Sequence, residues 1–170
     1  MGMTLTFNRL SVEKLRAMES DFALVEALVE NEDPETSLFI DKSWDGVHYL
    51  LTGRRFDGTT RLAECILGGE ILGGEENAEA FVVGYGPPMY LLPAEVKIIA
   101  QALSDINMKE VENRCVPATF AELDIYAFNA TNASSNADDE FEYFMSHLKE
   151  VIKFYQVAAS NKEVVVKLMT

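Results

Sequence analysis

The stretch that most restricts the fold is the C-terminal one, a predicted long helix at residues 138–160 followed by an apolar strand at residues 163–169. Three acidic residues open the helical segment, where the positive end of the helix dipole favours carboxylates. A stripe of apolar side chains then runs along it, and a stripe this wide has to pack against other parts of the chain. The stripe consists of Phe141, Phe144, Met145, Leu148, Val151, Ile152, Tyr155 and Ala159.

A second strand is predicted at the opposite end of the chain. Residues 3–7 alternate threonine with apolar side chains, a pattern typical of a strand with one buried face. Long helices over a small sheet that uses both chain termini indicate an α+β fold. With 170 residues, 48% of them hydrophobic, we expect a single compact domain over residues 1–170, with several helices and the long C-terminal one packed on the sheet.

Between the two predicted strands, several residues mark the starts of helices. Ser11 and Thr60 can cap helices through their hydroxyl groups. Pro93 suits the first turn of another helix, where its missing amide hydrogen costs nothing. The apolar run at residues 80–85 predicts a buried strand.

The chain is strongly acidic. It has 28 Asp and Glu against 14 Lys and Arg, a formal net charge of −14. Such a charge disfavours binding to nucleic acids and to anionic membranes, and it is compatible with a basic protein partner. Two cysteines far apart in the sequence, without a signal peptide, favour the cytoplasm. No apolar run is long enough to span a bilayer.

Residues 38–53 hold the only tryptophan, one of two histidines and many apolar side chains. We expect a helix with Ser43 as its N-cap and Gly53 as its left-handed C-terminal residue. At helical spacing, Trp44, Val47, His48 and Leu51 share one face, and Asp45, Tyr49 and Thr52 share the neighbouring face.

His48 is the candidate catalytic side chain of this helix. As a general base it would need a carboxylate to fix its ring, and Asp45 or Asp41 could supply one. The competing interpretation is a core or helix-tethering histidine, with Trp44 as a core residue. The only other histidine is His147, so we predict neither a metal site nor a cofactor.

The segment at residues 84–90 begins like a dinucleotide-binding loop, but prolines follow where the fingerprint requires a glycine and a helix. We interpret it as a strand end turned by Pro87 and Pro88. A functional alternative makes it the rim of a pocket, with Tyr85 and Tyr90 as walls. Together with Asp41, Trp44 and Tyr49, these two tyrosines are the candidate ligand-binding residues.

Residues 40–53, the opening residues 1–3 and Phe154 with Tyr155 make the chain similar to the YfbM-like family, uncharacterised bacterial proteins that form a domain-of-unknown-function family. The Asp-Lys-x-Trp-Asp-x-x-His block is the most specific part. The resemblance covers essentially the whole chain and implies a compact α+β domain in the bacterial cytoplasm. It implies no established activity, cofactor or catalytic residue. The matching positions, candidates for the family's function or for its fold, are Asp41, Lys42, Trp44, Asp45, His48, Thr52 and Gly53.

Three functional hypotheses follow. The leading one is a non-enzymatic acidic module that binds a basic protein, one version being the neutralisation of a basic toxin or nuclease. The alternative is a small-molecule-binding protein or enzyme with a pocket around His48, Trp44 and Asp45, bordered by Tyr49 or Tyr85. In the third, the Trp44 segment only stabilises the fold.

Overall fold

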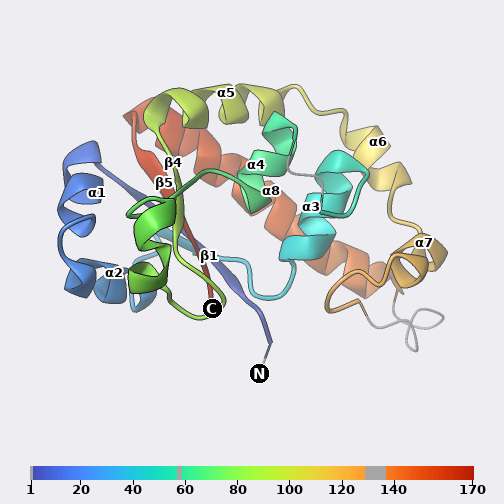
Figure 1. Ribbon diagram of the computed structural model, residues 1–170. Coiled ribbons are helices and arrows are strands. Elements are labelled where there is room, and N and C mark those ends of the chain that lie inside the picture. The colour runs from blue at the N-terminus through green and yellow to red at the C-terminus, as the bar shows by residue number, and fades with distance from the viewer. Residues whose placement is uncertain (1, 57–58, 129–136) are drawn as a thin grey trace.

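The pairing of the two terminal strands forms the centre of the molecule. The computed structural model describes residues 2–56, 59–128 and 137–170, and Figure 1 shows the arrangement of its elements. Strand β1 (Leu5–Leu10) lies antiparallel to β5 (Val164–Met169). The described strands form one antiparallel sheet of order β2-β1-β5-β4-β3. The edge strands are β2 (Ser37–Phe39) and β3 (Glu70–Ile71), and β4 (Met89–Leu91) lies between β5 and β3. The predicted α+β fold with a sheet built from both termini is confirmed.

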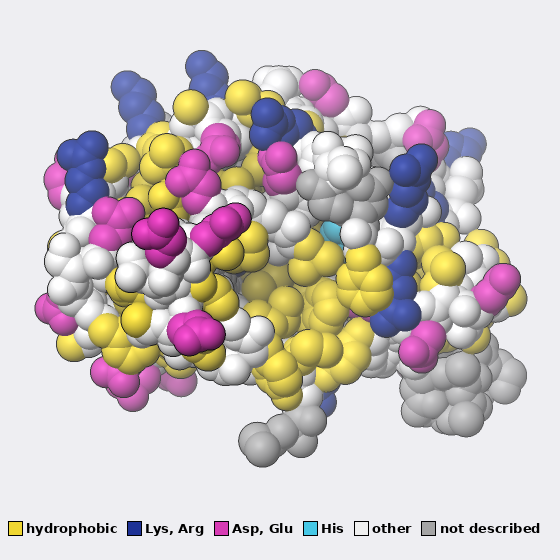
Figure 2. Space-filling view, in the orientation of Figure 1, with side chains coloured by type: hydrophobic (Ala, Val, Ile, Leu, Met, Phe, Trp, Pro, Cys, Tyr) yellow, Lys and Arg dark blue, Asp and Glu magenta, His cyan; other side chains and the backbone are white. Residues whose placement is uncertain are grey.

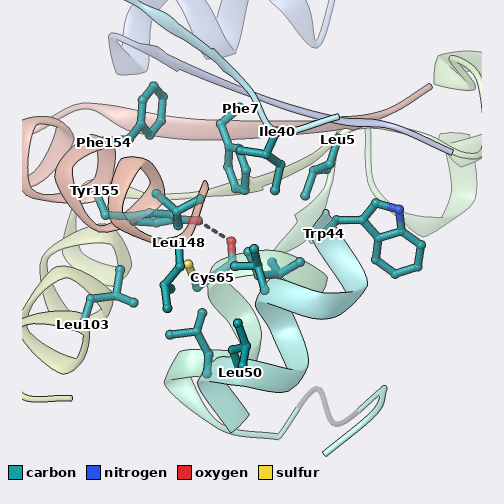
Figure 3. Close-up of a cluster of buried hydrophobic side chains, with 14 of the residues drawn as sticks. Leu5, Phe7, Ile40, Trp44, Leu50, Cys65, Leu103, Leu148, Phe154 and Tyr155 are labelled. Carbon is teal, nitrogen blue, oxygen red and sulfur yellow. Dashed lines mark hydrogen bonds between the residues drawn. The ribbon is translucent and has the colours of Figure 1, made fainter. Parts of the chain in front are cut away.

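Helices cover both faces of this sheet. Leu5, Phe7 and Val165 face the larger core, which contains the long helix α8 (Ala137–Asn161). Figure 3 shows this core, where the Tyr155 hydroxyl of α8 donates a hydrogen bond to the Cys65 carbonyl. The other helices on this side are α3 (Trp44–Thr52), α4 (Arg61–Leu67), α5 (Pro93–Ser104), α6 (Met108–Asn113) and α7 (Pro117–Glu122).

The opposite face of the sheet has a smaller core. Alternation along β5 directs Val164, Val166 and Leu168 to this side. They pack against α1 (Val12–Met18), α2 (Phe22–Val29) and the 3₁₀ helix η1 (Glu75–Phe81). Every strand residue of β5 before Met169 is therefore buried, on one face or the other.

Several predicted helix ends are confirmed. The Ser11 and Thr60 hydroxyls accept hydrogen bonds from first-turn amides of α1 and α4, and Pro93 begins α5. Gly53 closes α3 in the left-handed conformation, with φ of 69°. Ser43 does not act as predicted, because its hydroxyl donates 2.7 Å to the Ile40 carbonyl rather than accepting from an amide of the helix.

The strand predicted at residues 80–85 is wrong. Its first residues end η1, and Val83 and Gly86 form only an isolated bridge. Gly84 has φ of 58°, which interrupts extended backbone. The strand that pairs with β5 begins after the prolines, at Met89. A short apolar run does not by itself distinguish a strand from other buried segments.

The long helix α8 has nearly the predicted bounds, and its apolar stripe packs on the larger core. Within the described ranges, no helix combines the length and the apolar character needed to cross a bilayer.

Gly46 sets the distance between α3 and α8, which predicts an unusual stability effect. A Cβ at this position would lie 2.5 Å from both Cδ1 and Cε1 of the buried Phe144 ring. We expect Gly46→Ala to lower the free energy of unfolding by about 1–3 kcal/mol, although alanine normally favours a helix over glycine. Urea unfolding measures the change. In the background of Phe144→Leu the cost should be smaller, and equal costs in both backgrounds would contradict the steric explanation.

Candidate functional site

Helix α3, which carries most of the predicted site, is buried on all sides. Every residue from Trp44 to Leu51 is buried. The Trp44 indole nitrogen donates 3.2 Å to the Met3 carbonyl, and its ring lies 5.5 Å from that of Tyr126. Tyr49 meets the Phe120 ring edge to face at 5.2 Å. Both aromatic side chains are thus held within the core.

The two carboxylates expected beside His48 bind other groups. Asp45 Oδ2 accepts hydrogen bonds from Arg55 Nε at 3.2 Å and from the Tyr126 amide at 2.8 Å. Asp41 accepts from the Tyr143 hydroxyl of α8 at 3.0 Å. Burial, followed by this bond to Asp41, raises the pKa of Tyr143 to about 12. These contacts join α3 and its leading segment to distant parts of the chain.

His48 itself has no exposed surface. Its backbone carbonyl accepts a hydrogen bond from the Thr52 hydroxyl at 2.9 Å. Five surface pockets of the described residues are lined by other side chains and not by His48, Trp44 or Asp45. In residues 2–56, 59–128 and 137–170, no three potential metal-ligating side chains cluster together.

The two tyrosines of residues 84–90 border different pockets, which share Ile71 and Met89 as lining residues. Tyr90, in β4, is buried and lines a groove of about 1120 Å³. Tyr85 is 58% exposed and lines a pocket of about 350 Å³. The geometry therefore does not bring these two residues together in one rim, and His48 lines neither pocket.

The groove that Tyr90 borders is acidic. It is lined by Glu19 after α1, Glu70 in β3 and Glu75 in η1, and its described lining residues include no Lys, Arg or His. The Tyr90 hydroxyl donates 2.7 Å to Glu70, and this bond with burial and the nearby charges raises the pKa of Tyr90 to about 12. In Figure 2, acidic side chains gather on the left of the molecule. They lie over α1 and over η1, which is the unlabelled green helical segment beside α1 and α2 in Figure 1.

The smaller pocket is almost entirely apolar, and Figure 2 shows it as a hollow walled by hydrophobic side chains. Its one charged lining residue is Lys167, in the central strand β5. In register, Lys167 lies opposite Phe7 of β1 and Met89 of β4. The remaining walls come from Met3, Leu5, Ile66, Leu67, Ile71, Tyr85, Gly86, Pro87, Met89 and Met169.

Lys167 is only 3% exposed. Its Nζ donates a 2.5 Å hydrogen bond to the Glu64 carbonyl in the last turn of α4. Carbonyls at the end of a helix lack partners within the helix and carry partial negative charge, so they suit a cation. Burial nevertheless lowers the pKa of Lys167 from 10.5 to about 8, against the opposing effects of Cys65, Glu64 and Glu95.

Sequence reasoning missed Lys167. The signal was a lone lysine within the apolar run 164–169, but the sequence does not show whether such a strand lies at the edge or the centre of a sheet. At an edge the lysine would point to solvent. With helices on both faces, its ammonium group has to be buried.

The chain matches a protein-family model and is similar to a solved structure. Residues 1–167 match the model of a family described as a domain of unknown function, DUF1877. The crystal structure of YfbM from Escherichia coli, a protein of unknown function, is similar with a TM-score of 0.73 and 18% identity, over 98% of this chain and 99% of that one. This likeness concerns the fold. The sequence has no detectable match among curated proteins.

The contacts of Asp45 predict a structural role that can be measured. Asp45→Ala removes the carboxylate that accepts from Arg55 and from the Tyr126 amide and leaves Arg55 its bond to the Leu123 carbonyl; we expect it to lower the free energy of unfolding by about 3 kcal/mol. Asp105→Ala, at an exposed carboxylate, is the control and should cost less than about 0.5 kcal/mol. Equal costs in urea unfolding would contradict the structural role of Asp45.

The buried lysine predicts a gain of stability on its removal. Unfolding takes up a proton between pH 8 and 10.5, so the cost of the buried charge is complete below about pH 8 and disappears as the pH rises through 10.5. That cost is about 3 kcal/mol, and the hydrogen bond to Glu64 offsets about 1 kcal/mol. Lys167→Met should therefore raise the free energy of unfolding by about 2 kcal/mol at pH 7. The gain should shrink at pH 9.5, and a gain independent of pH would argue against this origin.

Proposed function

The chain belongs to the DUF1877 family of domains of unknown function, and we propose that it is a non-enzymatic acidic module that binds a basic protein. The formal charge of −14 supports attraction of a basic partner over a distance. Opposite charge accelerates association, as the neutralisation of a basic toxin or nuclease would require. In this proposal the partner supplies lysine and arginine side chains.

The observation that carries the proposal is the acidic groove. Glu19, Glu70 and Glu75 come from three separate elements and converge on one concave surface. Phe81 and Ile71 supply apolar wall beside them. A lysine or arginine can lay its methylene groups on such a wall while its charged end reaches a carboxylate. The groove thus offers both parts of a site for a basic side chain.

Neutralising the three groove glutamates tests the proposal. Glutamine in place of Glu19, Glu70 and Glu75 keeps an oxygen acceptor for Tyr90 and removes three charges. At about 0.5 kcal/mol for each partly exposed pair, the affinity for a synthetic peptide rich in lysine and arginine should fall roughly tenfold at low salt. Isothermal titration calorimetry measures this affinity.

The matched control also removes three charges. Glu110, Glu112 and Glu122 are exposed residues of α6 and α7, far from η1 in Figure 1. Their change to glutamine should reduce affinity much less than the groove variant does. Equal losses of affinity would show that the peptide responds to the overall negative charge of the protein and not to the groove. Absence of peptide binding by the unaltered protein at low salt would also contradict the proposal.

Small-molecule binding is the second candidate function. The sequence suggested it around His48, Trp44 and Asp45, whose side chains are buried and line none of the five pockets. We place this candidate instead at the apolar pocket of Lys167. A concave apolar site with one well-placed polar group is the usual form of a small-molecule site.

A further inference from the structure

The ammonium group of Lys167 lacks a counter-ion among the described residues. Its Nζ donates one hydrogen bond, to the Glu64 carbonyl, although an ammonium group has three donors. No carboxylate of the described ranges lies within 4.0 Å of it. A buried charge of this kind is costly unless an anion joins it.

The charges of Glu64 and Glu95 raise the pKa of Lys167 from a distance, but no described titratable group around Lys167 forms an ion pair with it. In α4, burial raises the pKa of the Cys65 thiol to about 12, so the thiol is neutral, and the Glu64 carboxylate pairs with Arg61 at 2.6 Å. The Glu95 carboxylate of α5 accepts a hydrogen bond from the Leu92 amide. In α8, burial raises the pKa of Tyr155 well above its usual value, so this hydroxyl is also neutral.

The pocket beside this cation is partly open to solvent. Tyr85 stands at its exposed end, where the Tyr85 amide donates 2.8 Å to the Met169 carbonyl and fixes the rim to β5. From there inward, the walls are formed by leucine, isoleucine, methionine and proline side chains. The site therefore combines an apolar surface with one buried lysine among its lining residues.

We propose that this pocket binds a medium-chain carboxylic acid, with the carboxylate on Lys167 and the hydrocarbon chain along the apolar walls. The ligand carboxylate supplies the counter-ion that the protein lacks. The volume of about 350 Å³ lies near the lower end of the range for small-molecule sites, which favours a chain of about eight carbons. This proposal does not depend on the acidic groove, whose described lining residues include neither Lys167 nor Tyr85.

Proton uptake is a specific consequence of this binding mode. In the free protein, burial holds the pKa of Lys167 at about 8, and a bound carboxylate would raise it. Binding at pH 8 should therefore take up a fraction of a proton. Above pH 8 the affinity should fall by up to about tenfold per pH unit, because less of the free protein carries the ammonium form.

Octanoate binding to the full chain is the test. Isothermal titration calorimetry at pH 7 should show binding at one site, and each methylene removed from the acid should weaken it roughly fourfold. Lys167→Met should weaken octanoate binding roughly tenfold to a hundredfold and abolish its pH dependence. Since this variant is expected to gain stability, failure to fold should not obscure the result.

Two controls separate the charge from the apolar walls. Lys97→Met removes an exposed lysine of α5 and should leave octanoate binding unchanged. 1-Octanol should bind the unaltered protein and Lys167→Met with similar affinity. Absence of octanoate binding, or equal octanoate affinity with and without Lys167, would overturn the proposal and leave Lys167 as a cap of α4 alone.

Discussion

The antiparallel pairing of β1 with β5 is the interaction on which the remaining structure depends. It joins residues more than 150 positions apart in the sequence, from Leu5 with Met169 to Leu10 with Val164. Alternate side chains of this pair form the inner layer of both cores. The helices on either side can bury their apolar stripes only when this pair exists, so formation of the fold requires contacts of long sequence separation.

The sequence predicts this architecture well because its signals are local. Periodicity and capping residues identify the terminal strands, the long helix and the starts of α1, α4 and α5. The contacts of the candidate site residues are harder to predict from local sequence signals. Asp45 is buried because Arg55 and the Tyr126 amide reach it, and the second of these partners lies 81 residues away. Spacing along one helix could suggest only neighbours such as His48.

Burial of Lys167 has the same long-range origin. Strand alternation assigns it to a face, but the helices that cover that face come from distant segments. Alternation also explains why two unlike sites lie beside the same strands. In β4 and β5, Tyr90 and Val166 face the smaller core, whereas Met89 and Lys167 line the apolar pocket, and Met89 also borders the acidic groove. A shift of one residue in this register would exchange the two sets.

The close approach of the two chain ends makes the chain suitable for circular permutation. Thr4 and Thr170 exchange backbone hydrogen bonds of 2.7 and 3.0 Å, so a linker of a few residues could join them. In such a circular permutant, β5 and β1 would form an ordinary hairpin, and the most distant pairing of the native chain would become its most local one. Folding rates fall as contacting residues become more distant in sequence. The permutant would therefore form the same sheet as the native chain and would fold faster.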